Sequence, residues 1–141
     1  MNRSKTSAAL LVGGQSTRMG APKSALLIDG RALLEIAVAQ VAPLANRIAL
    51  VGRMDESTRA VKDRLAKALD TATLEDDPAF KGPLAGIVSV MESAPDANWL
   101  VLSCDMPTMS TDALRWLLDQ HDPASPATVG ALVGRDEIEP F

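Results

Sequence analysis

Residues that could bind phosphate gather early in the chain, directly after its first apolar run. Residues 8–12 are apolar, and two glycines and several hydrogen-bond donors follow them: Gly13, Gly14, Ser16, Thr17, Arg18 and Lys23. Glycine allows positive φ and a close approach of the backbone to a ligand, while hydroxyl, guanidinium and ammonium groups suit phosphate oxygens. The stretch contains neither the GxGxxG nor the Gly-Lys-Ser/Thr pattern. It therefore indicates either a phosphate-binding loop of another kind or a solvated surface loop.

Carboxylates follow two later apolar runs. Asp76 and Asp77 come soon after the run 72–74, and Asp105 comes soon after the run 99–103. An aspartate at the end of a buried strand can bind Mg²⁺, which then keeps some waters and reaches substrate phosphates. The same aspartates could instead begin turns before nearby prolines. These residues alone leave both interpretations open.

Short apolar runs alternate with segments whose apolar residues recur at helical spacing, which predicts βαβ units. The predicted strands are 8–12, 48–52, 72–74, 99–103 and 129–133. The first predicted helix carries an apolar stripe and ends before Pro43: Leu33, Leu34, Ile36, Ala37, Val38, Gln40 and Val41. The later ones cover 56–69, a segment opening at 81–87 with Ile87, Val88 and Met91 on its apolar face, and 113–120, capped by Ser110-Thr111-Asp112. At the carboxyl edge of such a sheet, the glycine loop, Asp76 and Asp105 would lie together.

Composition favours the same fold class. The chain has 141 residues, of which 47% are hydrophobic, with no Tyr, two Phe and two Trp. Ala, Leu and Val with few aromatics favour helices packed on a sheet over an aromatic-rich β-sandwich. We therefore expect an α/β fold with a single domain over residues 1–141.

Charge and cysteine content limit the partners and the chemistry. The net charge of −4 argues against general nucleic-acid binding, which needs a basic face. With no signal segment and no membrane-length apolar run, the sequence predicts a cytoplasmic protein with no membrane partner. The single cysteine, Cys104, excludes an intramolecular disulfide. A thiol dyad of Cys104 with His121 is the weaker hypothesis, because a cysteine at the end of an apolar strand is more often a small buried side chain.

The motifs in this order resemble the nucleotidyltransferase family that contains molybdenum cofactor guanylyltransferase. Three stretches carry the resemblance, which extends from about Ala8 to Phe141. They are Gly13-Gly14-Gln15-Ser16-Thr17-Arg18-Met19-Gly20 with Lys23, Gly82-Pro83-Leu84-Ala85-Gly86-Ile87, and Cys104-Asp105-Met106-Pro107. The resemblance implies a three-layer, Rossmann-like nucleotide-diphospho-sugar transferase fold with a mostly parallel sheet. It also implies that the GMP part of GTP is joined to molybdopterin and that pyrophosphate is released.

The same resemblance assigns roles to individual residues. Lys23, Arg18 and Asp105 would be catalytic, and Asp105 would bind Mg²⁺. Nucleotide binding would involve Leu11, Val12, Gly13, Gly14, Ser16, Arg18, Lys23, Asp76, Gly82 and Asp105, with Asp76 facing the guanosine half. Because the acceptor's phosphate would attack the α-phosphorus directly, catalysis would rest on alignment and charge neutralisation.

Two alternatives and one expectation about the end of the chain accompany this hypothesis. The chain could be a cytidylyltransferase of the same superfamily, or a nucleotide-binding module without catalysis. Family members continue beyond Phe141, so we expect a domain that lacks its C-terminal part. A sheet edge or face left uncovered in this way would allow pairing with a second copy of the chain.

Overall fold

The central feature of the computed structural model is a parallel β-sheet. The structure describes residues 6–13, 23–66 and 71–130, and within these ranges the sheet has four strands. They are β1 (Thr6–Leu11), β4 (Arg47–Val51), β5 (Thr71–Leu74) and β6 (Asn98–Ser103). Their spatial order is β5-β4-β1-β6, so β1 pairs with β4 on one edge and with β6 on the other. The carboxyl ends of β1 and β6 thus form the switch point of the sheet, where open α/β sheets bind ligands.

Side chains of the strands alternate between the two faces of the sheet. In β1, Ala8 and Leu10 belong to the larger hydrophobic core, whereas Ala9 belongs to a smaller core on the opposite face. The neighbouring strand β4 repeats the pattern, with Ile48 and Leu50 in the larger core. Burial on both faces explains why these strands appear in the sequence as continuous apolar runs.

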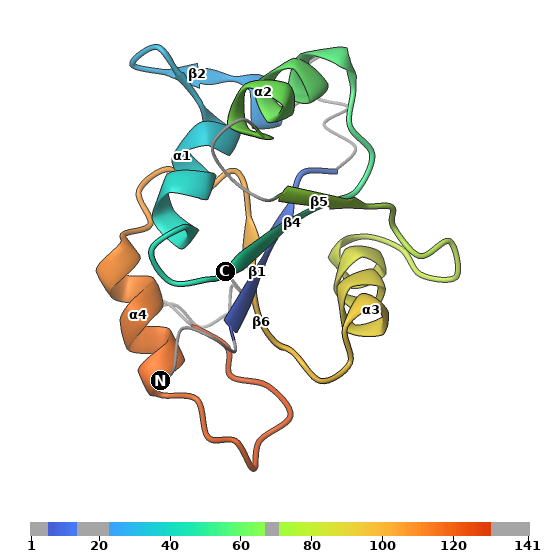
Figure 1. The fold of residues 1–141 in the computed structure, drawn as a ribbon, viewed down its shortest axis with the longest axis vertical. Helices are drawn as coiled ribbons and strands as arrows, with labels where there is room; N and C mark the ends of the chain where they lie inside the picture. The colour runs from blue at the N-terminus through green and yellow to red at the C-terminus, as the bar shows by residue number, and fades with distance from the viewer. Residues whose placement is uncertain (1–5, 14–22, 67–70, 131–141) are drawn as a thin grey trace, which may run out of the picture.

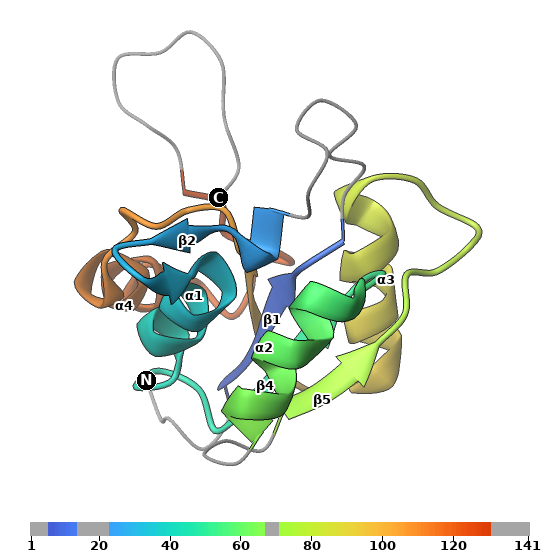
Figure 2. The ribbon, with the colours of Figure 1, turned by 90° about the horizontal axis from the view of Figure 1, so that it is seen from above.

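Helices cover both faces of the sheet, which gives three layers. Helices α1 (Leu33–Val41), α2 (Glu56–Ala66) and α4 (Thr111–Asp119) contribute to the larger core, and α3 (Pro83–Ser93) covers the other face through Val90. Figures 1 and 2 show α1 and α4 on one side of the sheet and α3 on the other. The predicted three-layer, Rossmann-like architecture with a parallel sheet is confirmed. Within the described ranges, no helix has both the length and the apolar character needed to cross a membrane.

A short hairpin precedes α1. The 3-10 helix η2 (Lys23–Ala25) leads into β2 (Leu27–Ile28) and β3 (Arg31–Ala32), which pair antiparallel. Asp29 and Gly30 have φ values of 49° and 80°, as a two-residue type I′ turn requires. An Asp-Gly pair between two short strands is the sequence signal typical of this turn.

The helix ends follow local signals in the sequence. Helix α1 ends at Val41, before Pro43, as predicted. Helix α4 begins after Ser110, whose Oγ accepts a hydrogen bond from the backbone N–H of Ala113 at 3.1 Å, so the predicted cap is confirmed. The end predicted for the second helix, 67–69, lies outside the described residues.

An ion pair joins the two helices that follow η2. The Arg64 guanidinium of α2 lies 2.9 Å from Glu35 Oε1 of α1. The other oxygen of Glu35 accepts a hydrogen bond from the Ala32 backbone N–H at 3.0 Å. The Ala32 hydrogen bond, supported by Arg64, holds the pKa of Glu35 below its usual value against the opposing effect of burial. This carboxylate therefore caps the first turn of α1 and ties α2 to it.

Helix α3 buries a different stripe from the predicted one. Ala85, Gly86 and Val90 are buried, whereas Met91 is 57% exposed, so its predicted inward position is wrong. The helix has apolar residues on two sides, and helical spacing alone does not say which side faces the sheet. Gly86 determines which side of α3 faces the sheet, because a Cβ at this position would lie 2.8 Å from Leu11 Cδ2. Only the glycine side of α3 can approach the sheet so closely.

The predicted fifth strand is not confirmed in its described part. Val129 and Gly130 belong to no strand, and residues 131–133 lie outside the described ranges. A short apolar run in the sequence does not by itself distinguish a strand from other structure.

Neighbouring residues of α3 test this orientation. Val90→Ala should lower the free energy of unfolding by about 2 kcal/mol, because it removes two buried methyl groups and leaves a cavity. The matched control Met91→Ala should change it by less than about 0.5 kcal/mol, because the side chain is mainly in water. Urea unfolding of both variants is the measurement. An equal loss for both would contradict the observed orientation of α3.

Candidate functional site

Two opposite charges meet at the switch point of the sheet. The Lys23 ammonium lies 3.1 Å from Asp105 Oδ2, although the residues are 82 positions apart in the chain. Lys23 begins η2, and Asp105 follows the end of β6. Both side chains are partly open to solvent, at 49% and 36% exposure. The structure thus brings together two of the three residues predicted to be catalytic.

The Asp105 carboxylate is held in its ionised form. Ser103 Oγ donates a hydrogen bond to Asp105 Oδ1, and Lys23 contacts the other oxygen. The Ser103 hydrogen bond, supported by Lys23, keeps the pKa of Asp105 below its usual value, although burial acts in the opposite direction. The carboxylate is therefore charged at neutral pH and available to a cation.

A buried hydrogen bond anchors Ser24, the residue that follows Lys23 in η2. Ser24 Oγ lies 2.7 Å from Thr58 Oγ1 of α2, and both residues are only 1% exposed. The backbone N–H of Thr58 in turn donates to Asp55 Oδ1 at 2.8 Å. Because Ser24 is fixed against α2, its neighbour Lys23 starts from a fixed backbone position. Sequence analysis did not identify Ser24, whose only signal is a hydroxyl next to the predicted lysine.

The strands β1 and β4 leave the sheet in direct backbone contact. A Cβ on Gly13 would lie 2.9 Å from the Arg53 nitrogen, and a Cβ on Gly52 would lie 2.7 Å from the Gly13 nitrogen. Gly52 also has a φ of 108°, which favours glycine. Gly13 is not among the positive-φ residues, so the expectation that it supplies this conformation is wrong, and its role is the close approach. Gly52 was missed, although it directly follows an apolar run just as Gly13 does.

The Asp76 carboxylate lies beside two of these close-packed glycines. Ideal Cβ positions on Gly52 and Gly86 would be 3.4 Å from Asp76 Oδ2 and 3.2 Å from Asp76 Oδ1. Asp76 itself is exposed, at the loop after β5. Its neighbour Asp77 has a different task, because Asp77 Oδ1 accepts a hydrogen bond from the Ala79 N–H at 2.8 Å and so shapes the turn. The two adjacent aspartates thus divide between an open carboxylate and a turn residue.

Of the other predicted binding residues, the structure describes Leu11, Val12 and Gly82. Leu11 and Val12 pack their side chains inward, the Leu11 carbonyl accepts a hydrogen bond from the Cys104 N–H, and the Val12 N–H donates to the Val51 carbonyl. Gly82 has a φ of 64° with no atom within 4 Å of an ideal Cβ, so its backbone conformation, and not a close contact, calls for glycine before α3. Three predicted residues, Gly14, Ser16 and Arg18, lie outside the described ranges.

Asp105 fits a divalent cation as one ligand among several. In the ranges that the structure describes, no group of three or more His, Cys, Asp or Glu side chains could hold a metal ion alone. Mg²⁺ in phosphate-transfer sites takes one or two carboxylates and completes its shell with waters and substrate phosphates. The ammonium of Lys23, 3.1 Å away, shows that this carboxylate already accepts a positive charge. The donor set therefore fits a cation that arrives with a phosphate ligand.

Cys104 and His121 do not form a nucleophilic pair. Cys104 is 5% exposed in the larger core, and burial raises the pKa of its thiol to about 11. His121 Nδ1 lies 3.0 Å from Thr128 Oγ1, beyond the end of α4. The interpretation of Cys104 as a small buried side chain is confirmed.

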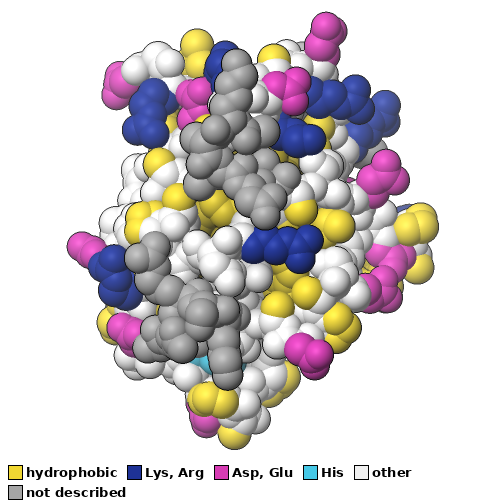
Figure 3. All heavy atoms as spheres, viewed as in Figure 1, with side chains coloured by type: hydrophobic (Ala, Val, Ile, Leu, Met, Phe, Trp, Pro, Cys, Tyr) yellow, Lys and Arg dark blue, Asp and Glu magenta, His cyan; other side chains and the backbone are white. Residues whose placement is uncertain are grey.

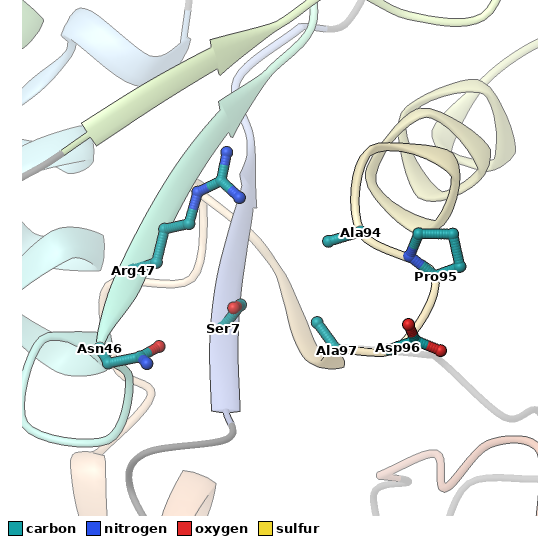
Figure 4. Close-up of a pocket in the computed structure, with 7 residues that line it drawn as sticks. All are labelled: Ser7, Asn46, Arg47, Ala94, Pro95, Asp96 and Ala97. Atoms are coloured by element: carbon teal, nitrogen blue, oxygen red, sulfur yellow. The ribbon is translucent and has the colours of Figure 1, made fainter.

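A separate hollow of about 520 Å³ lies at the opposite edge of the sheet. It is lined by Ser7, Asn46 and Arg47 at the amino ends of β1 and β4, and by residues 94–97 after α3. Figure 4 shows that the Arg47 guanidinium and the Asp96 carboxylate point to different parts of it. On the face in Figure 3, charges of both signs are interspersed with apolar side chains. This hollow contains none of the predicted site residues, and its polar groups do not converge.

Known proteins are similar to this chain in sequence and in fold. The chain is 31% identical, over 137 residues, to a probable molybdenum cofactor guanylyltransferase of Bacillus anthracis, which covers 95% of this chain and 66% of the relative. It spans just under two thirds of the length of such curated relatives. Molybdopterin-guanine dinucleotide biosynthesis protein A from Archaeoglobus fulgidus superposes with a TM-score of 0.56 at 23% identity, over 79% of this chain and 53% of that one.

A second solved structure shares the fold. Rv0371c from Mycobacterium tuberculosis, in complex with manganese, superposes with a TM-score of 0.56 at 18% identity, covering 84% of this chain and 60% of that chain. The family model of the MobA-like NTP transferase domain matches residues 8–141. This range includes all the described strands and helices except the first two residues of β1. The chain therefore belongs to the family of MobA-like NTP transferase domains.

Proposed function

We propose that this chain is a nucleotidyltransferase that joins the GMP part of GTP to molybdopterin and releases pyrophosphate. The observation that carries the proposal is the contact between Lys23 and Asp105 at the switch point of the sheet. A cation and an ionised carboxylate at this place suit a triphosphate and its metal ion. The guanine and molybdopterin parts rest on relatives named molybdenum cofactor guanylyltransferase, of which the chain spans 66%.

The reaction needs alignment and charge neutralisation from the protein. An oxygen of the molybdopterin phosphate forms a bond to the α-phosphorus of GTP, and the bond from that phosphorus to the bridging oxygen breaks. Pyrophosphate takes the electron pair. Lys23 and Arg18 neutralise phosphate oxygens while the charge moves toward the leaving group. No covalent enzyme intermediate is needed, which agrees with the high pKa of the Cys104 thiol.

Asp105 is the residue that would hold Mg²⁺ in this site. Its carboxylate is ionised and partly open, and the manganese complex of the related fold supports a divalent cation here. Such a cation supplies Lewis-acid stabilisation of phosphate charge. The protein's own part is to keep this carboxylate charged and fixed next to Lys23.

Removing the charge of Asp105 tests the metal assignment. Asp105→Asn should lower Mg²⁺-dependent pyrophosphate release at least about 100-fold, because the metal's transition-state contribution is several kcal/mol. The free energy of unfolding should change by less than about 1 kcal/mol, since the ion pair is solvent-exposed. Asp112→Asn, which removes an 88% exposed carboxylate, is the control. Activity of Asp105→Asn near that of the control would refute the assignment.

Removing the ammonium of Lys23 tests phosphate binding. Lys23→Ala should weaken GTP binding about ten- to hundredfold, as expected for a charge-assisted hydrogen bond, and should leave guanosine binding nearly unchanged. Calorimetry with both ligands, at two salt concentrations, is the measurement, because screening should weaken only the GTP term. Lys62→Ala on α2 is the control with the same charge change. Equal losses for GTP and guanosine would mean that Lys23 does not address phosphates.

Base preference separates guanylyl from cytidylyl transfer. GTP should bind at least about tenfold more tightly than CTP, because the open Asp76 carboxylate can accept hydrogen bonds from the guanine ring. Asp76→Asn should reduce this preference, whereas Asp77→Asn, with the same charge change on a turn residue, should preserve it. If CTP binds more tightly, a cytidylyltransferase replaces this proposal. If GTP binds but no pyrophosphate appears with molybdopterin present, the chain is a nucleotide-binding module.

A further inference from the structure

One buried amide holds the loop that follows Asp105. Gln40 of α1 is 8% exposed, and its Nε2 lies 3.2, 3.3 and 2.6 Å from the carbonyl oxygens of Met106, Pro107 and Met109. These three carbonyls belong to the segment that connects Asp105 to α4. A single side chain of α1 therefore contacts all three of these carbonyl oxygens.

The orientation of the Gln40 amide is fixed by these partners. Three carbonyl oxygens can accept hydrogen bonds only from the NH₂ end, so the other end must point away from the loop. That oxygen, Oε1, is buried and has no hydrogen-bond partner among the described residues. An unpaired buried oxygen is unfavourable, and an apolar side chain would avoid it. The donors of Nε2 are thus the feature that distinguishes Gln40 from the leucines and valines of the same stripe.

The loop is short, so its attachment affects Asp105 directly. The backbone N–H of Cys104 donates to the Leu11 carbonyl at 3.3 Å, which fixes the start of the segment to β1. A turn closed by Met109 N–H and the Met106 carbonyl, at 3.2 Å, follows on the other side. Asp105 lies between the β1 contact and the Gln40 contact. With one of them removed, the backbone that carries Asp105 would be tied to the fold from one side only.

We propose that Gln40 is a positioning residue that sets the affinity of the site for a divalent cation. It fixes the 106–109 segment and thereby holds the Asp105 carboxylate in place next to Lys23, without touching substrate itself. The inference rests on the proposed role of Asp105. It adds Gln40 to the residues that support the site, although Gln40 is 66 positions before Met106 in the chain. Pre-organisation of a ligand by hydrogen bonds behind it raises metal affinity.

Gln40→Met tests the proposal, because methionine keeps the length and apolar stem of the side chain and lacks the donors. Mn²⁺ is the probe, with its affinity for the GTP complex measured by electron paramagnetic resonance. Binding of Mn²⁺ should weaken about tenfold, and binding of GTP without metal should stay within about twofold. In the metal-free protein, the Met109 amide should exchange with solvent faster than in the wild type. Higher Mn²⁺ should restore the turnover of Gln40→Met, and should not restore that of Asp105→Asn.

Thr111→Val is the matched control. Thr111 Oγ1 donates to the backbone carbonyl of Gln40 at 3.0 Å. The variant therefore loses one hydrogen bond between α4 and α1 and keeps the contact of the Gln40 amide with the 106–109 segment. Its Mn²⁺ affinity should equal that of the wild type. Wild-type Mn²⁺ affinity in Gln40→Met, or an equal loss in Thr111→Val, would overturn the proposal.

Two further results are interpretable. If Gln40→Met does not fold, Gln40→Asn takes its place with the same expectations, because its amide is one methylene too short to reach the three carbonyls. If the wild type binds Mn²⁺ with GTP but releases no pyrophosphate, the proposed transferase function fails, and the Mn²⁺ and exchange measurements still decide the role of Gln40.

Discussion

The structure depends on the parallel pairing of β1 along both of its edges. Residues 7–11 pair with 47–51 on one side, and residues 6–11 pair with 98–103 on the other. With both edges and both faces occupied, β1 has no contact left for solvent, and its side chains can only be small or apolar. Three of the described candidate site residues are placed relative to this strand. Gly13 follows the end of β1, and Asp105 follows the end of the neighbouring strand β6. Asp76 follows β5, which lies on the other side of β1, beyond β4.

Close backbone packing at the strand ends makes the glycines depend on one another. Gly13 and Gly52 each occupy the space that the other's side chain would need, and Gly86 admits Leu11 in the same way from α3. These glycines serve packing between protein segments, whereas the sequence context of Gly13 suggested contact with a ligand. The result is nevertheless useful to a ligand, because the positions next to the Asp76 carboxylate at Gly52 and Gly86 carry no side chain.

The fold was largely predictable because its signals are local. The first four apolar runs, the Asp-Gly pair, Pro43 and the Ser110 cap each act within a few residues, and the structure has the expected strand, turn, helix end or cap at each. The inward face of α3 was not predictable, because that helix carries apolar residues on two sides and the choice depends on the contact between Gly86 and Leu11.

The contacts that support the site were harder to predict, because their partners are distant in the chain. Gln40 was grouped with an apolar stripe, and the presence of one amide among leucines and valines was the signal that could have identified it. Ser24 and Thr58 are 34 positions apart, and nothing in the sequence pairs them. The Lys23 and Asp105 motifs were individually recognisable, but their mutual contact arises only from the strand order.

The pairing of β1 with β6 also has a consequence for synthesis of the protein. Thr6 meets Asn98, so a chain growing from its amino terminus carries β1 and β4 long before β6 exists. During that interval one edge of β1, whose residues 8–11 are all apolar, has unpaired N–H and C=O groups, which is the kind of surface that recruits strands of other chains. Long-range parallel pairing is also slow to form. The nascent chain should therefore rely most on chaperones between the emergence of β4 and that of β6.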